Sequence, residues 1–80
     1  MITFKVLLFA GLHEICGTPF LSVTVTNDAR VMDLIHAAEQ LCPSLVGQVF
    51  RVAVDSRYVA AETKLPALAE IAFIPPVSGG

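Results

Sequence analysis

A chain of 80 residues suits one domain with a modest core. Hydrophobic residues make up 55% of it and charged residues only 15%, which is more apolar surface than so small a core can bury, so we expect an exposed apolar patch that contacts a partner. The net charge of −2 and the scattered basic residues argue against nucleic-acid binding, and no apolar stretch approaches a membrane span.

The first predicted element is a strand over residues 2–9. Apolar side chains alternate along one face of it, at Ile2, Phe4, Val6 and Leu8. Leu7 and Phe9 make the end of the other face apolar as well, which favours a central place in the sheet. A short helix is expected over residues 10–16, with Gly17 as its stop.

The middle of the chain predicts a second strand and the main helix. Residues 20–26 are rich in β-branched side chains and form the strand, and residues 27–28 (Asn-Asp) are expected to turn the chain and cap the helix. The helix is predicted over residues 31–41 and ends before Pro43. Its apolar stripe consists of Val31, Leu34, Ile35, Ala38, Leu41 and Cys42.

The last third of the chain predicts three more strands. Residues 50–54 form a long strand, residues 55–57 a turn and residues 58–60 a short return strand. Residues 65–69 are a connector, too short for the second full helix that a ferredoxin-like fold needs. Residues 70–74 form the final strand.

One amphipathic helix beside these strands predicts an α+β domain of the β-grasp, ubiquitin-like type over residues 1–74. In this fold the first and last strands are parallel neighbours at the centre of a mixed sheet, and the most apolar strands of this chain are those two. Both would then end at the same edge, which places Phe9 near Ile74.

Residues 75–80, Pro-Pro-Val-Ser-Gly-Gly, are expected to form a flexible C-terminal tail. Consecutive prolines hold an extended path, and two glycines without Cβ atoms fit a slot too narrow for other residues. The tail therefore predicts that the α-carboxylate of Gly80 is presented to the active site of another protein.

Three segments resemble the MoaD family, the small sulfur-carrier subunit of molybdopterin synthase. They are Phe9-Ala10-Gly11-Leu12-His13-Glu14 with Gly17, Ala53-Val54-Asp55, and Ala72-Phe73-Ile74 with the Pro75-Pro76-Val77-Ser78-Gly79-Gly80 ending. The chain departs from the family pattern at His13, where arginine is common, at Asp55, where asparagine is frequent, and at Leu68-Ala69-Glu70, where Gly-Asp-Glu is usual. The lost glycine implies a different turn before the last strand.

The resemblance implies a mechanism at Gly80. A MoeB-type adenylating enzyme with MgATP would convert its carboxylate to an acyl-adenylate, and a sulfurtransferase or other sulfur donor would displace AMP and leave a thiocarboxylate. The tail would then enter a MoaE-type large subunit, where the sulfur attacks cyclic pyranopterin monophosphate. The small subunit would be non-catalytic, without a permanently bound cofactor, cytoplasmic, and part of a heterotetramer.

Site residues follow from the same resemblance and from the tail geometry. We expect Gly80 to be the reacting residue, with Gly79 beside it. Partner contacts are expected at Phe9, Tyr58, Ile74, Pro75, Pro76, Val77 and Ser78. Arg51, Arg57 and Lys64 are expected on a solvated face, where one of them is available for acidic groups of the partner.

Other readings stay open. The chain could carry sulfur for another pathway, such as thiamine or tRNA thiolation, act as a ubiquitin-like modifier, or be a degenerate paralogue used only for binding. No metal site is expected, because the His and Cys spacings are wider than those of structural zinc sites. Cys16 and Cys42 are expected to be reduced core thiols, and no secretory signal is expected at the start of the chain.

Overall fold

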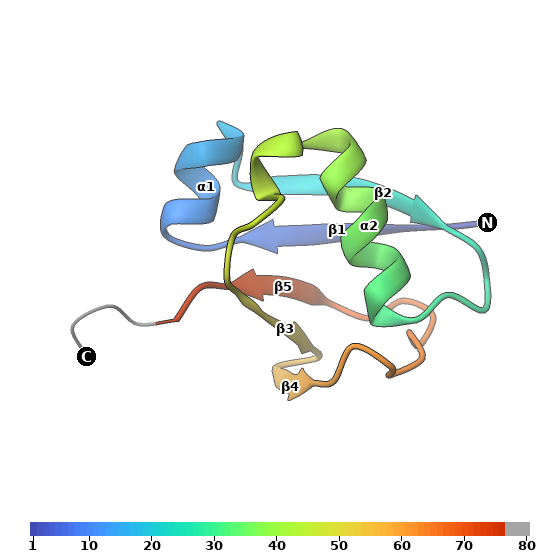
Figure 1. Cartoon of the computed structure of the whole chain (residues 1–80). Coiled ribbons are helices and arrows are strands. Elements are labelled where there is room, and N and C mark those ends of the chain that lie inside the picture. The colour runs from blue at the N-terminus through green and yellow to red at the C-terminus, as the bar shows by residue number, and fades with distance from the viewer. Residues whose placement is uncertain (77–80) are drawn as a thin grey trace.

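The computed structural model describes residues 1–76, which form a five-stranded mixed sheet with its helices on one face (Figure 1). The strands are β1 (Ile2–Leu8), β2 (Phe20–Val25), β3 (Arg51–Val54), β4 (Arg57–Val59) and β5 (Ile71–Ile74). Their order in the sheet is β2-β1-β5-β3-β4. The helices are α1 (Gly11–Cys16), α2 (Val31–Leu41) and the 3-10 turn η1 (Pro43–Leu45), which the sequence did not predict.

The centre of the sheet is the parallel pair of β1 and β5, in the register Val6↔Ile71 to Leu8↔Phe73. The pairing continues one step beyond β1, because the Phe9 N–H donates to the Phe73 carbonyl oxygen at 3.2 Å. On its other side β5 pairs antiparallel with β3. The last strand therefore lies at the middle of the sheet, and the predicted β-grasp fold is confirmed.

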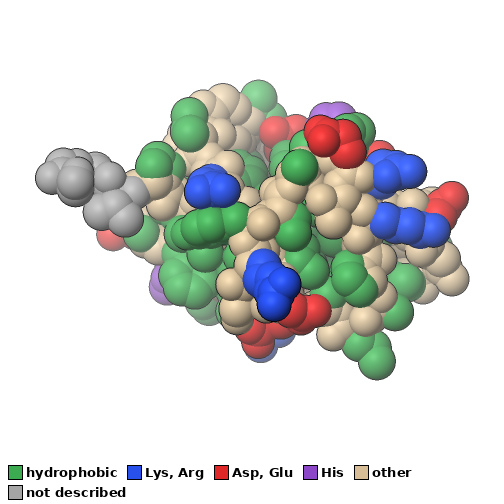
Figure 2. All heavy atoms as spheres, turned by 90° about the horizontal axis from the view of Figure 1, so that it is seen from below, with side chains coloured by type: hydrophobic (Ala, Val, Ile, Leu, Met, Phe, Trp, Pro, Cys, Tyr) green, Lys and Arg blue, Asp and Glu red, His purple; other side chains and the backbone are tan. Residues whose placement is uncertain are grey.

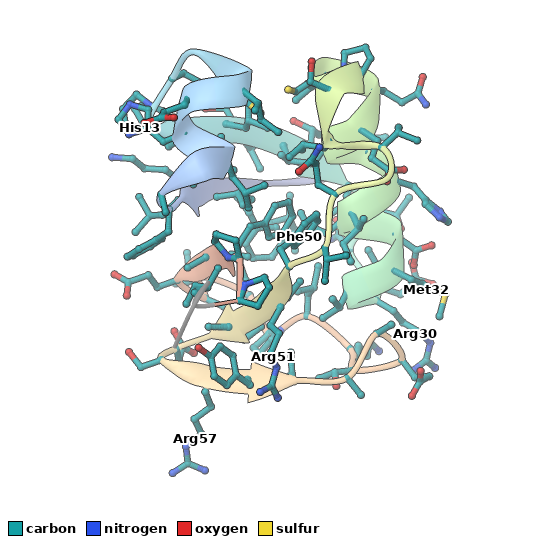
Figure 3. All side chains as sticks on the ribbon, turned by 60° about the vertical axis from the view of Figure 1, so that its left-hand side comes forward. His13, Arg30, Met32, Phe50, Arg51 and Arg57 are labelled. Carbon is teal, nitrogen blue, oxygen red and sulfur yellow. The ribbon has the colours of Figure 1, made fainter. Side chains whose placement is uncertain are left out.

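The core lies between the sheet and the helices. One face of each long strand contributes to it, through Phe4, Val6, Leu8, Val23, Val25, Val52, Val54, Ile71 and Phe73. The fully buried Phe73 ring stacks on Phe50, with the two centroids 4.6 Å apart. Phe50 was predicted to begin the third strand. It instead precedes β3 and turns its ring into the core (Figure 3).

Helix α2 has the predicted bounds, but one position of its predicted apolar stripe is wrong. Leu34 and Ala38 are buried, whereas Leu41 is 56% exposed. The cause is the end of the helix at Leu41, after which Cys42 leaves helical geometry (φ −134°, ψ 87°) and leads into η1. Leu41 is left beside the outer edge of β2. None of the helices in residues 1–76 has the length and hydrophobicity that a membrane span requires.

The start of α2 also differs from the prediction that residues 27–28 cap it. The N-cap residue is Arg30, whose backbone N–H donates to the Asp33 carboxylate at 2.8 Å. The Val31 N–H, one of the amides left without an intrahelical partner, donates to the Thr63 carbonyl oxygen at 2.9 Å. The connection after β4 therefore satisfies the helix start, a long-range contact that local sequence does not reveal.

Besides Ala10, the residues other than glycine at positive φ within residues 1–76 lie in two turns. Asp55 (φ 50°) and Ser56 (φ 70°) form the two-residue connection of the β3–β4 hairpin, where both positions need a left-handed backbone. Leu68, ahead of β5, has φ 61° and is 98% exposed. Its side chain gains no burial that could offset the strain of that conformation, which costs about 1–2 kcal/mol for a residue with a Cβ atom.

Replacing Leu68 by glycine is expected to stabilise the domain. Relief of the backbone strain exceeds the greater freedom of glycine in the unfolded chain, for a net gain of about 0.5–1 kcal/mol. Thermal unfolding should show the midpoint rising by a few degrees. The neighbouring exposed Ala67, which is not at positive φ, is the matched control. Ala67→Gly should destabilise slightly, and an L68G protein less stable than wild type would contradict the strain argument.

Candidate docking face and tail root

The sheet face opposite the helices carries an open depression of about 340 Å³. It is lined by side chains that point away from the core on four adjacent strands and their connections, namely Leu7, Phe9, Ala53, Ser56, Tyr58, Glu70, Ala72 and Ile74. Figure 2 views the molecule from the β4 edge of the sheet, where hydrophobic side chains lie beside basic ones. We call the residues that line this depression the docking face.

The docking face brings together three residues that the sequence analysis selected from distant parts of the chain. Phe9 is 46% exposed and Tyr58 51% exposed, while Ile74 is half-buried. Pro75 is half-buried and Pro76 exposed, and both follow Ile74 directly. The other residues expected at the site, Val77, Ser78, Gly79 and Gly80, lie outside the described residues.

Strand direction explains why these residues meet. Because β1 and β5 run parallel, both end at one edge of the sheet, where Phe9 follows β1 and Pro75 follows β5. Ile74 is also paired with Arg51 at the start of the antiparallel β3. We call residues 74–76 the tail root. The central pairing thus fixes the tail root against the docking face.

Phe9 is held by a tight turn with an unusual backbone. Ala10 has φ 49° and ψ −125°, a conformation that glycine usually supplies at the second position of such a turn. The Leu12 N–H donates to the Phe9 carbonyl oxygen at 3.1 Å and closes the turn. A strained position of this kind persists only where the surrounding structure determines it, and such positions cluster at functional sites.

Sequence reasoning missed the small residues that create the hollow. Ala53 on β3 and Ala72 on β5 are paired in register and lie between the larger Phe9, Tyr58 and Ile74. Short side chains at matched positions of adjacent strands leave a gap in an otherwise apolar surface. The signal was present in the sequence, but reading it requires the register between two strands that are distant in the chain.

Charges stand at both ends of the docking face. At the end near the β3–β4 turn, the Glu70 N–H donates to the Asp55 Oδ1 at 2.9 Å, and the Asp55 N–H donates to the Glu70 carbonyl oxygen at 2.8 Å. At the end near the tail root, the Arg51 guanidinium lies over the Tyr58 ring, 4.0 Å from its centroid. Two hydrogen bonds between Asp55 and Glu70 therefore fix the β3–β4 turn. The Arg51 cation is held by the Tyr58 ring.

The two cysteines lie away from the docking face, in or against the core. Cys42 is buried and Cys16 half-buried, and both belong to the packing around the helices. Burial, and then the neighbouring Cys42 thiol, raise the pKa of Cys16 from 9.0 to about 12. Within residues 1–76 no group of three His, Cys, Asp or Glu side chains is placed to hold a metal ion.

The raised pKa of Cys16 makes this thiol a poor nucleophile. At pH 8 its reaction with iodoacetamide should be at least about a hundredfold slower in the folded protein than in urea, because the thiolate is the reacting species. Peptide mass spectrometry distinguishes alkylation of Cys16 from alkylation of Cys42. The folded state binds the Cys16 proton more tightly than the unfolded state does, which contributes to the free energy of unfolding. This contribution is complete below the unfolded pKa of 9.0 and is lost as the pH rises towards the folded pKa of about 12. Equal rates of Cys16 alkylation in the folded protein and in urea would contradict the raised pKa.

Comparisons with known proteins identify the family and the fold of the chain. The ThiS family model matches residues 6–80. The molybdopterin synthase sulfur carrier subunit of Dictyostelium discoideum is 33% identical over 82 residues, covering 96% of this chain and 95% of that protein. Among solved structures, SAMP1 from Haloferax volcanii has a TM-score of 0.86 at 31% identity, covering 98% of this chain and 99% of that one. A putative molybdopterin converting factor subunit 1 from Pyrococcus furiosus shares the fold, with a TM-score of 0.87 at 24% identity, covering 96% of this chain and 100% of that one.

Proposed function

The chain belongs to the ThiS family of small sulfur carriers, and from this membership we propose that it is the sulfur carrier subunit of a molybdopterin synthase. Carriers of this family are adenylated and thiocarboxylated at a C-terminal glycine, which is Gly80 in the proposal. The observation that carries the proposal is the position of the tail root, where Ile74 borders the docking face and Pro75 and Pro76 extend from it. A partner bound to that face would receive the tail directly.

The proposed chemistry starts from an unreactive group. The Gly80 carboxylate is anionic and resonance-stabilised, so it resists attack by a nucleophile. An adenylating enzyme of the MoeB type transfers AMP from MgATP to it and releases pyrophosphate. A sulfur donor then attacks the acyl carbon and AMP leaves, which gives the thiocarboxylate. In a MoaE-type large subunit that sulfur attacks cyclic pyranopterin monophosphate, and water then cleaves the bond between the sulfur and the Gly80 acyl carbon, which restores the carboxylate. Two such transfers build the dithiolene.

In the proposal, the domain, the tail and the partner protein have different roles. Residues 1–74 supply a folded domain with an apolar docking face, and residues 75–80 supply the reacting terminus. The partner supplies the donors and acid–base groups that stabilise charge in the transition state. The chain is then a non-catalytic cosubstrate, and AMP and sulfur are bound only transiently at Gly80.

Deleting Gly80 is expected to abolish sulfur loading without unfolding the domain, because the last strand, β5, ends at Ile74. Wild type and the truncated chain would each be incubated with the adenylating enzyme, MgATP and a sulfur donor. Intact-protein mass spectrometry then measures thiocarboxylate formation, and thermal unfolding checks the fold. A truncated chain that still accepts sulfur would refute the role of Gly80.

Ile74→Asp is expected to weaken binding of the large subunit by about tenfold or more, because it places a carboxylate in the apolar contact. Isothermal titration calorimetry measures the affinity. Val46→Asp is the matched control, since Val46 is 62% exposed and follows η1 on the helical side of the molecule. Equal affinities of the two variants would remove Ile74 from the interface.

A second candidate function is protein modification, because SAMP1 of Haloferax volcanii, a small archaeal modifier protein, is 31% identical to this chain. A modifier uses the same activated glycine to form an isopeptide bond with a lysine. Immunoblots of native extracts separate the two: a ladder of conjugates favours the modifier, and a single band that carries a thiocarboxylate favours the carrier. A carrier for thiamine or tRNA thiolation would also give the single band, and it would fail to bind a MoaE-type subunit.

A further inference from the structure

Two cations rest on aromatic rings on the open face of the sheet, one on each side of the depression. Arg51 Cζ lies 4.0 Å from the centroid of the Tyr58 ring, and Lys5 Nζ lies 4.4 Å from that of Phe20. Tyr58 lines the depression, whereas Phe20 and Lys5 do not. Through Tyr58, Arg51 therefore stands at the border of the docking face, whereas Phe20 adjoins it only through its strand partner Leu7.

Arg51 carries a charge that the described residues leave without an acidic neighbour. It pairs with Ile74 in the sheet, so it lies level with the tail root. The acidic residue that lines the depression, Glu70, precedes Ile74 by four positions, which is roughly 13 Å along the strand. Asp55 is held in its own turn by Glu70. The side-chain hydrogen bonds found in residues 1–76 do not involve the Arg51 guanidinium.

The position of the Arg51 guanidinium over the Tyr58 ring leaves its N–H groups available to bind a carboxylate. The Arg51 Cζ lies over the Tyr58 ring, and the N–H donors of a guanidinium point outward in the plane of the group, where they can bind another molecule. A side chain already held on a ring loses less conformational freedom when it binds. The planar fork of N–H groups matches the two oxygens of a carboxylate.

We propose that Arg51, held on Tyr58, binds an acidic side chain of the protein that docks over the depression. The partner surface would then have an apolar centre opposite Ala53 and Ala72 and an Asp or Glu carboxylate at the side nearest the tail root. This inference rests on the proposed function, since it requires a docked partner, and it identifies the contact that selects that partner.

Arg57 supplies a matched control within the same hairpin. Like Arg51, it is exposed and does not itself line the depression, but it points away from the molecule in Figure 3, whereas Arg51 rests on the Tyr58 ring. Both arginines can lose the same charge by substitution with glutamine. A general effect of net charge would weaken binding in both variants equally, but a specific ion pair affects only Arg51.

The test measures the affinity of the MoaE-type catalytic subunit from the same organism for wild type, R51Q, R51K and R57Q by calorimetry, at low and at high salt. Loss of a charged hydrogen bond should weaken R51Q by about tenfold or more and leave R57Q within about twofold of wild type. R51K should fall between them, because lysine keeps the charge without the fork. High salt should weaken wild type more than R51Q. Equal affinities of R51Q and R57Q, with both variants folded by thermal unfolding, would overturn the inference.

The same experiment separates failure of the inference from failure of the proposed function. If the catalytic subunit does not bind wild type, the proposed function fails, and the four proteins are then measured against the MoeB-type adenylating enzyme. A loss of affinity for the adenylating enzyme in R51Q but not in R57Q would support the inference with that partner. Equal affinities of R51Q and R57Q would overturn it. Sedimentation of the chain alone tests a second copy as the occupant. A wild-type dimer that R51Q dissociates would also overturn the inference.

Discussion

The parallel pairing of β1 with β5 places two distant parts of the chain at one edge of the sheet, and every feature of the candidate site depends on it. Its backbone hydrogen bonds extend as far as the Phe9 N–H and the Phe73 carbonyl oxygen. The same strands bury Val6, Leu8, Ile71 and Phe73 on one face, which makes the pairing the centre of the hydrophobic core. The other face of these strands is left for Leu7, Ala72 and Ile74. Stability and presentation of the tail root therefore come from one structural unit.

The high hydrophobic content of the chain is explained by the open face of the sheet. A sheet covered by helices on one face leaves its second face exposed, and here that face is apolar around the depression. The hollow exists because two alanines are aligned between larger side chains, and the strained turn at Ala10 holds Phe9 at its border. The few charges nearby are placed at its ends. An apolar surface with charges at its border suits a partner that must bind, receive a tail and then release it.

Much of the fold could be predicted from the sequence because its signals are local or repetitive. The three- and four-residue spacing of α2, with Pro43 after it, gave its bounds, and the alternation along residues 2–9 gave the first strand. The parallel pairing followed from the order of the elements, whose single main helix fits a β-grasp sheet, and from the high apolar content of the first and last strands. Local signals failed where the determining contact is long-range, since the start of α2 depends on the carbonyl oxygen of Thr63 and not on residues 27–28.

The candidate site could be predicted only in part for the same reason. Phe9, Tyr58 and Ile74 were selected through the tail geometry and the family resemblance, but the depression between them needs the register of Ala53 with Ala72. The stacking of Arg51 on Tyr58 likewise depends on how β3 pairs with β4, which residue spacing does not specify. Leu41 was assigned to the buried stripe because a helical pattern does not show that the last turn of α2 lies beside β2, the edge strand of the sheet. In each case the missing information is the position of one element relative to another.

Intact-protein mass spectrometry of this chain purified from its native host tests the central claim most directly. The account predicts a population whose mass corresponds to one oxygen replaced by sulfur, with the change located at Gly80 by fragmentation. A chain that keeps its full carboxylate mass even with an active adenylating enzyme, MgATP and a sulfur donor would contradict it.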